Sequence, residues 1–344
     1  MSTRERDDGT FVPLVERVSM DTSKNNPISP PSDVAIQLER GIEYHKLREF
    51  EKAVSCFQGA IATYRQLADR AGETRALIGL SSALYGLGDY AAVIGACHAG
   101  MTAAREVGDR ASEKQALDNL GNTYRHLRDY QQALQHQTHS IDIARALADT
   151  KGEAVTFSNM GLVYKAMGDC DAAIVHYQKG LALANEAGDL YIEGQILRNL
   201  GNTYHGLGHY AKTVECYERL LEIAHYRGDK RSEIHILKNL GSVYYTMENY
   251  SKAIERHQQR LAIAQRIQDY RHQAQSLESL GIIYDARGQY SCALSCHEQQ
   301  LQLAQRLNDI RAIRKIQATL RNLYYAIGDY AKAGEYSMVE PQAC

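Results

Sequence analysis

The sequence predicts an all-α protein built from about eight consecutive helix-turn-helix repeats. No proline occurs between Ser32 and Glu340, although globular chains average about one proline in twenty residues and proline breaks helix interiors. Small and aromatic residues also recur with a fixed period of 40 residues. A period of that length is typical of stacked helical repeats. We therefore expect about sixteen helices and no sheet.

Four columns define the repeat: a glycine, a tyrosine three residues later, a second aromatic residue nine residues later and an alanine twelve residues later. The glycine column is Gly41, Gly121, Gly161, Gly201, Gly241 and Gly281, with Ser81 and Arg321 in the two remaining places. We interpret all four columns as packing positions. Glycine admits a close approach of the two helices, alanine is the matching notch, and tyrosine fills the wedge between units.

The third repeat shows how each helix is expected to begin and end. The apolar spacing predicts a first helix, helix A, from Arg110 to Leu127 and a second, helix B, from Tyr130 to about Leu147. Asp129 is placed to cap helix B. An aspartate column is placed to cap each helix A, and glutamates four residues later add charge in the first turn. The capping column is Asp69, Asp109, Asp149, Asp189, Asp229, Asp269 and Asp309.

The repeats divide the chain into three expected parts. Residues 1–32, rich in Ser, Pro, Asn and Asp, are predicted to form a disordered tail. Residues 33–338 form the repeat array, and residues 339–344 form a C-terminal tail. The apolar cluster between Phe11 and Val18 has two interpretations: part of an unstructured tail, or a segment that docks on the array.

Composition limits the classes of function and partner. The net charge is −2, so the basic excess typical of nucleic-acid binding is missing. No apolar run approaches the roughly 20 residues of a membrane span, and the N-terminus lacks the apolar core of a secretory signal. Seven cysteines without clustering favour reduced thiols over a disulfide framework. We expect a cytoplasmic protein that binds neither nucleic acid nor membrane.

The columns resemble the tetratricopeptide repeat, most clearly at Leu120-Gly-Asn-Thr-Tyr124 and Leu200-Gly-Asn-Thr-Tyr204. The period is 40 where the usual unit has 34 residues, and a Gly-Asp or Ala-Asp turn replaces the usual proline. Both departures resemble the long-helix subtype with Leu-Gly-Asn signatures. The resemblance implies a right-handed superhelix in which helix A lines a concave groove. It does not identify a partner, because one fold hosts many functions.

Asparagines stand at the helix A positions that the resemblance places in the groove. Four of them, Asn119, Asn159, Asn199 and Asn239, form one column, and Asn122 and Asn202 stand three residues later. An amide offers both donors and an acceptor, so such a ladder resembles those that hold the backbone of an extended peptide. The alternative is that these amides satisfy polar groups within the array.

Basic side chains occupy neighbouring groove positions between the third and sixth repeats. They are Arg125, Lys165, Arg198, Lys238, His205 and His235. A locally basic groove favours a peptide with acidic side chains or a free carboxyl end. The alternative is an ordinary solvated face.

The sequence contains no motif that indicates catalysis or a cofactor: no Walker loop, GxSxG, HExxH or CxxC occurs. A zinc site was considered at Cys216, Cys292, Cys296, His257 and His297. Equivalent side chains of stacked units point the same way, however, and do not converge as zinc ligands must. His257 and His297 also share a packing column with Phe57, Tyr177 and Tyr217. We expect no metal, no cofactor and no enzymatic activity.

The function predicted from the sequence is that of a monomeric, non-catalytic scaffold or adaptor that binds an extended, acidic peptide segment of a partner. Two alternatives remain open. One is a peptide-sensing regulator, and the other is an assembly chaperone or subunit of a fixed complex.

Overall fold

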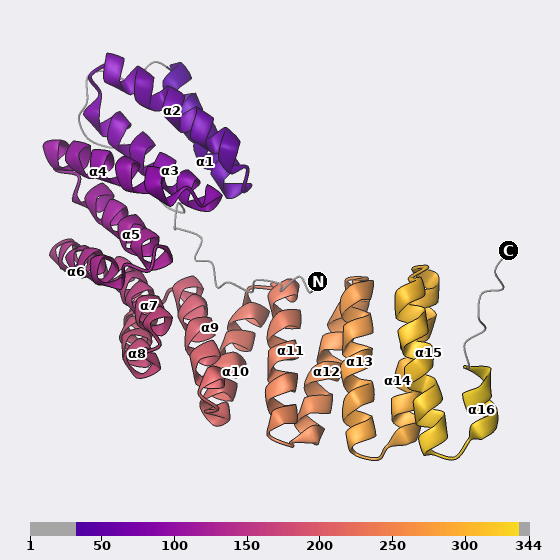
Figure 1. Cartoon of the computed structure of the whole chain (residues 1–344). Coiled ribbons are helices and arrows are strands. Elements are labelled where there is room, and N and C mark those ends of the chain that lie inside the picture. Colours follow the sequence, from indigo (N-terminus) through magenta and orange to yellow (C-terminus); the bar gives the residue numbers. More distant parts are fainter. Residues whose placement is uncertain (1–31, 337–344) are drawn as a thin grey trace. The chain divides into compact units, whose positions relative to one another are not determined.

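The computed structural model describes residues 32–336, which form sixteen α-helices and no strand (Figure 1). Consecutive helices are joined by short turns, as the repeat pattern predicts. The expected N-terminal tail lies outside the described residues except for Ser32, which begins the first helix. The segment Phe11–Val18 and the C-terminal tail at 339–344 also lie outside them.

The helices alternate between A and B along the chain. The A helices are α1 (Ser32–Lys46), α3 (Arg70–Leu87), α5 (Arg110–His126), α7 (Thr150–Met167), α9 (Leu190–Gly206), α11 (Lys230–Thr246), α13 (Tyr270–Ala286) and α15 (Ile310–Ala326). The B helices are α2 (Phe50–Gln66), α4 (Tyr90–Val107), α6 (Tyr130–Ala146), α8 (Cys170–Glu186), α10 (Tyr210–Tyr226), α12 (Tyr250–Arg266), α14 (Tyr290–Arg306) and α16 (Tyr330–Glu335). The boundaries predicted for the third repeat differ from these by one residue at each C-terminal end.

The described chain divides into two compact units, residues 32–199 and 200–336, with the boundary inside α9. Each helix packs on the next from α1 to α8 in the first unit, and from α10 to α16 in the second. The first unit has a core that includes Leu77, Leu80, Leu117 and Leu120. Leucines and Tyr324 of α14 and α15 form a core in the second. Burial is therefore supplied by stacking, since one amphipathic pair cannot cover its own apolar face.

Aspartates cap the A helices as predicted. Asp109 accepts a hydrogen bond from the backbone N–H of Ser112 at 3.0 Å, and Asp149 accepts one from Gly152 at 2.8 Å. Each bond satisfies an N–H group that has no partner within the helix. The other members of the column make the same bond to the third residue that follows.

The first-turn glutamates do more than add charge. Glu73 is buried and accepts from Arg65 Nε at 2.6 Å and from Arg70 Nη1 at 2.7 Å. Burial alone would raise the pKa of Glu73, but the two arginine hydrogen bonds outweigh it and hold that pKa below its ordinary value. Glu113 repeats the arrangement with two arginines. These carboxylates tie the end of one helix B to the start of the next helix A.

The glycine column receives large side chains from helix B. A Cβ on Gly161 would lie 2.5 Å from a ring carbon of Tyr177, and Phe57 and Tyr217 cover Gly41 and Gly201 in the same way. Contacts this short do not occur, so the ring and any larger residue exclude each other. In the second repeat Ser81 replaces the glycine, and the covering residue is the small Cys97.

His257 and His297 take the place of these rings in the sixth and seventh repeats. Both are buried, and each imidazole lies over its glycine, Gly241 or Gly281. Burial, with a smaller contribution from the nearby Arg260 cation, lowers the pKa of His257 to about 4. His257 is therefore a neutral packing residue at pH 7, as the column predicts.

The tyrosine column lies between successive repeats. Tyr244 of α11 and Tyr324 of α15 are buried. Tyr244 donates its hydroxyl hydrogen to Glu218 on the preceding helix B at 3.2 Å, and Tyr324 does the same to Glu298 at 2.8 Å. The ring thus fills the wedge while its hydroxyl is satisfied, as buried tyrosines require.

The glycine–ring pairs predict strong coupling between the two positions. Gly161→Ser should lower the free energy of unfolding by about 1–3 kcal/mol, because the added atoms overlap the ring of Tyr177. Combining it with Tyr177→Cys, which reproduces the Ser81–Cys97 pair, should cost less than the sum of the two single changes. Denaturant unfolding of the four proteins measures this coupling.

Gly95→Ser is the control for that cycle. Gly95 also lies in a helix, but a Cβ there would meet no atom within 4 Å, so its effect should stay within about 0.5 kcal/mol. Additive costs for Gly161→Ser and Tyr177→Cys would contradict the proposed exclusion.

The buried histidine predicts acid sensitivity. Because the pKa of His257 is about 4 in the folded protein and 6.5 is its ordinary value, the unfolded chain binds the proton more readily. The stabilisation that neutral His257 contributes to the folded protein is fully present above pH 6.5 and is lost as pH falls toward 4. The total loss in the free energy of unfolding is on the order of 3 kcal/mol.

His257→Tyr, which restores the residue of Tyr177 and Tyr217, should remove that part of the loss. Unfolding midpoints at pH 7.5 and pH 5 for the two proteins give the measurement. If the difference between variant and parent is the same at both values, His257 does not titrate on unfolding.

Candidate functional site

The predicted peptide-binding residues are buried or partly buried up to Lys165 in the first unit, and exposed or partly exposed from Arg198 onward. In the first unit, α3 packs against α5 and α5 against α7. As a result Asn119, Asn122 and Asn159 are buried, and Asn159 has no exposed surface. The expectation that these asparagines are exposed is therefore wrong. The A helices of this unit lie close enough to cover their own polar column.

Asn119 serves the packing of the array. Its Nδ2 donates to Ser81 Oγ at 2.9 Å and to Ser82 Oγ at 3.2 Å, which joins α5 to α3. The amide of Asn119 thus satisfies polar groups of the neighbouring repeat and does not face a groove.

Asn159 and Asn122 differ from Asn119. Both amide atoms of Asn159 and the Oδ1 of Asn122 are buried without a hydrogen-bond partner among the described residues. Such atoms cost free energy that nothing in the array repays. Their burial is thus unexplained by stacking alone.

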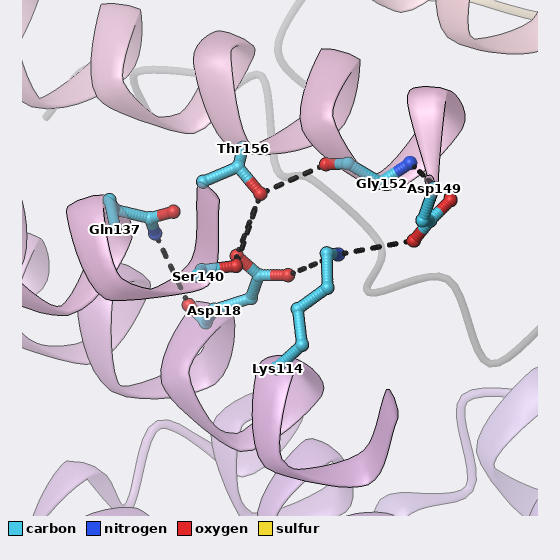
Figure 2. A network of polar contacts seen from close by, with 7 residues as sticks. All are labelled: Lys114, Asp118, Gln137, Ser140, Asp149, Gly152 and Thr156. Atoms are coloured by element: carbon cyan, nitrogen blue, oxygen red, sulfur yellow. Dashed lines mark hydrogen bonds and ion pairs between the residues drawn. The ribbon is translucent and has the colours of Figure 1, made fainter. Parts of the chain in front are cut away.

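A polar network surrounds Asp118, the residue before Asn119 in α5 (Figure 2). The carboxylate accepts from Lys114 Nζ at 3.1 Å, from Ser140 Oγ at 2.7 Å and from Thr156 Oγ1 at 3.1 Å. These partners come from α5, α6 and α7, and all are buried. The network therefore fixes three helices by a charge that has its compensating cation inside the unit.

The sequence alone indicates only part of the bonding of Asp118. A signal was present: lysine stands four residues before Asp118, on the same face of the helix. The hydroxyl partners Ser140 and Thr156 could not be paired with it without knowing how α6 and α7 lie against α5.

Two of the three cations predicted in the first unit, Arg125 and Lys165, are partly buried. Arg125 Nη2 lies 3.0 Å from His126 Nε2, and its Nε is buried without a partner. Burial lowers the pKa of Lys165 below its ordinary value. Arg198 is exposed and Asn199 partly exposed at the end of this unit, both on α9.

In the second unit the predicted residues face solvent. His205, His235 and Lys238 are exposed, as is Asn202, and Asn239 is partly exposed. Asn202 Oδ1 accepts from the Tyr217 hydroxyl at 2.6 Å, which leaves its Nδ2 available to donate. The ammonium of Lys238 forms no ion pair, and the Asn239 side chain no hydrogen bond, with any residue that the structure describes.

The described helices offer no metal site. No group of three or more His, Cys, Asp or Glu side chains within residues 32–336 is placed to hold a metal ion. His257 and His297 instead belong to the packing column, and Cys292 is exposed. Burial raises the pKa of Cys216 and Cys296 to about 11 each. Within the same range, no helix combines the length and apolarity that crossing a bilayer requires.

The tetratricopeptide repeat family model matches residues 112–186, 192–266 and 236–306, together more than half of the chain. The protein belongs to the tetratricopeptide repeat family. No curated protein matches the sequence.

Solved structures share the fold. A Rap protein complexed with Competence and Sporulation Factor aligns with a TM-score of 0.56 at 15% identity, over 90% of this chain and 78% of that one. Aspartyl phosphate phosphatase F from Bacillus subtilis aligns with a TM-score of 0.54 at 11% identity, over 91% and 94%.

A third structure is a STAND signal-transduction ATPase with a tetratricopeptide repeat sensor from Pyrococcus horikoshii. It gives a TM-score of 0.59 at 18% identity over 87% of this chain. The chain spans less than half of that protein, 46% of its length. At these identities the similarity establishes the fold.

The contrast between two asparagines of one column can be measured. Asn159→Leu should raise the free energy of unfolding by about 1 kcal/mol or more, because it removes two unpaired buried polar atoms. Asn119→Leu should lower it by about 1 kcal/mol, because the bonds to Ser81 and Ser82 are lost. Denaturant melts of both variants provide the comparison, and equal losses would mean that Asn159 is as structural as Asn119.

Proposed function

We propose that the protein is a non-catalytic scaffold that binds an extended, acidic peptide segment of a partner along the A helices of its second unit. Membership of the tetratricopeptide repeat family supports a role in protein interaction. The observation that carries the proposal is a set of exposed polar groups without internal partners on α9 and α11. They are Asn202 Nδ2, the amide of Asn239 and the ammonium of Lys238.

These groups stand beside positions that packing already fills. On α11, Leu237, Leu240 and Tyr244 are buried while Lys238 is exposed and Asn239 partly exposed. Amides can pair with the N–H and C=O groups of an extended backbone without reading its side chains. Lys238, with His205 and His235 when protonated, adds positive charge that favours acidic residues in the ligand.

The first unit contributes less to this proposal. Asn119 is hydrogen-bonded to α3. Asn122 and Asn159 are buried, so a ligand would reach them only if α3, α5 and α7 separated. Arg125 and Lys165 are partly covered. We therefore place the principal contacts on residues 202–239 of the second unit.

Charge reversal at Lys238 should weaken binding of acidic peptides. Amidated, N-acetylated nonapeptides of graded Asp and Glu content, displayed as an array, should bind the full chain in order of acidity. Lys238→Glu should weaken the best of them about three- to tenfold at low salt, and added salt should reduce the difference. Fluorescence anisotropy gives the affinities.

Asn239→Ala and Arg266→Glu separate binding of the peptide backbone from attraction by charge. Asn239→Ala should weaken acidic and neutral peptides alike, since it removes a backbone contact. Arg266 is exposed on helix B α12, so reversing its charge should leave affinity unchanged. Equal effects of Lys238→Glu and Arg266→Glu would indicate attraction by net charge and would overturn the proposed face.

A sensor of a diffusible peptide is the second candidate. It is favoured by similarity over most of the chain to a Rap protein solved with a bound factor and to a repeat module described as a sensor. A sensor should change conformation on binding, whereas a scaffold need not. Small-angle scattering with and without the best array peptide discriminates the two.

A further inference from the structure

The second unit contains a buried arginine whose charge is not needed for the stacking of the repeats. Arg260 of α12 is 1% exposed. The same position in six other repeats holds an uncharged residue: Ala60, Gly100, Ser140, Gly180, Leu220 and Gln300. A repeat can therefore pack with a small, apolar or amide side chain here, and the guanidinium needs another explanation.

The hydrogen bonds of Arg260 are incomplete. Its Nη2 donates to Gln275 Oε1 on α13 at 2.7 Å, and its Nε is buried without a partner. No carboxylate of the described residues forms an ion pair with it. Burial lowers the pKa of Arg260 to about 10, against the opposing influence of Asp269. At pH 7 the group remains a cation, and a buried cation without a paired anion is costly.

Asp269 is already engaged elsewhere. Its Oδ1 accepts from the backbone N–H of His272 at 3.0 Å, and its Oδ2 lies 2.6 Å from Nδ1 of the same histidine. It caps α13, so it does not supply the missing partner of Arg260.

The equivalent place in the first unit shows what is missing. There Ser140, in the position of Arg260, bonds to the carboxylate of Asp118, whose cation is Lys114. In the sixth repeat the positions of Asp118 and Lys114 are Lys238 and Ile234. In the sixth repeat, cations therefore stand at the positions of both Ser140 and Asp118, and no carboxylate takes the place of Asp118.

Gln275 is the residue that engages the guanidinium of Arg260. It is partly exposed, and it stands three residues after His272, whose ring contacts that of His235 at 5.3 Å between centroids. Loss of the single hydrogen bond to Gln275 would free the Nη2 of Arg260 for another acceptor. The carboxylate one turn further along α13, Glu278, pairs with Lys315 at 2.6 Å, and Asp269 is engaged by His272.

We propose that Arg260 is a binding site for a carboxylate, supplied by an acidic residue or the C-terminus of the bound peptide, and that Gln275 Oε1 occupies the place of a ligand oxygen. The inference rests on the proposed function and deepens it, because it adds one buried residue to the groups that favour an acidic ligand. A guanidinium pairs with a carboxylate through two parallel hydrogen bonds, which a lysine cannot reproduce.

Glutarate is the probe for the site itself. Added to the full chain at matched ionic strength, it should raise the unfolding midpoint, as any ligand of the folded state does. Arg260→Gln, which places the residue of Gln300 at this position, should weaken glutarate about tenfold or more, the loss expected for charge-assisted hydrogen bonds. Arg266→Gln removes a charge from the exposed part of α12 and should bind glutarate as the parent does.

Gln275→Ala keeps the proposal testable if Arg260→Gln fails to fold. It removes the competing acceptor from a partly exposed side chain, so glutarate should bind several-fold more tightly. Equal stabilisation of the parent, Arg260→Gln and Arg266→Gln, no stabilisation of the parent, or no tightening by Gln275→Ala would each overturn the site.

Peptides identify the source of the carboxylate. An amidated peptide containing Glu and a free-acid peptide containing Gln distinguish a side-chain carboxylate from a C-terminal one. The peptide that binds Arg260→Gln more weakly than the parent protein marks the natural source. If acidic peptides bind the parent and Arg260→Gln equally, the carboxylate site is wrong and the peptide-binding proposal stands. If glutarate binds as expected and no peptide does, the site stands and the peptide-binding proposal fails.

Discussion

The repeat depends on one packing constraint: a small residue on helix A must face a larger one on helix B, and the two positions cannot both be large. Gly161 accepts the ring of Tyr177, Gly241 accepts the imidazole of His257, and Ser81 faces Cys97. Because the two volumes are complementary, helix B can vary widely at this position while the distance between the helices is maintained. The tyrosine wedges between repeats depend on that distance.

The sequence was sufficient to predict the fold because each packing column has one structural meaning in every repeat. Glycine, tyrosine and capping aspartate lie where the period places them. The polar columns of helix A do not share this property. Asn119 and Asn239 belong to one column, yet the first is buried against α3 and the second is partly exposed. Exposure there depends on how closely neighbouring A helices pack, which the periodicity of a single helix does not report.

Charge was harder to predict than shape. Asp118 reads as an acid of the inner face until Ser140 and Thr156 are seen to bond to it from two other helices. Arg260 breaks an uncharged column, and that departure was visible in the sequence. Its lack of a carboxylate partner was not, because Gln275 becomes its neighbour through the stacking of α12 and α13. Positions that packing leaves free are thus where repeats of one length can acquire different chemistry.

The constant unit length has a consequence for how such a chain can change. The A helices from α3 to α15 each begin after an aspartate, and each glycine of the glycine column meets the residue sixteen positions later. Gain or loss of one whole repeat joins a B helix to an A helix with the same cap and the same notch, so it preserves these two features on both sides. Loss of a single residue within a helix would instead place a Cβ beneath a ring. The array is therefore tolerant of edits in multiples of its period and intolerant of smaller ones, which makes duplication the simplest route by which its length was reached.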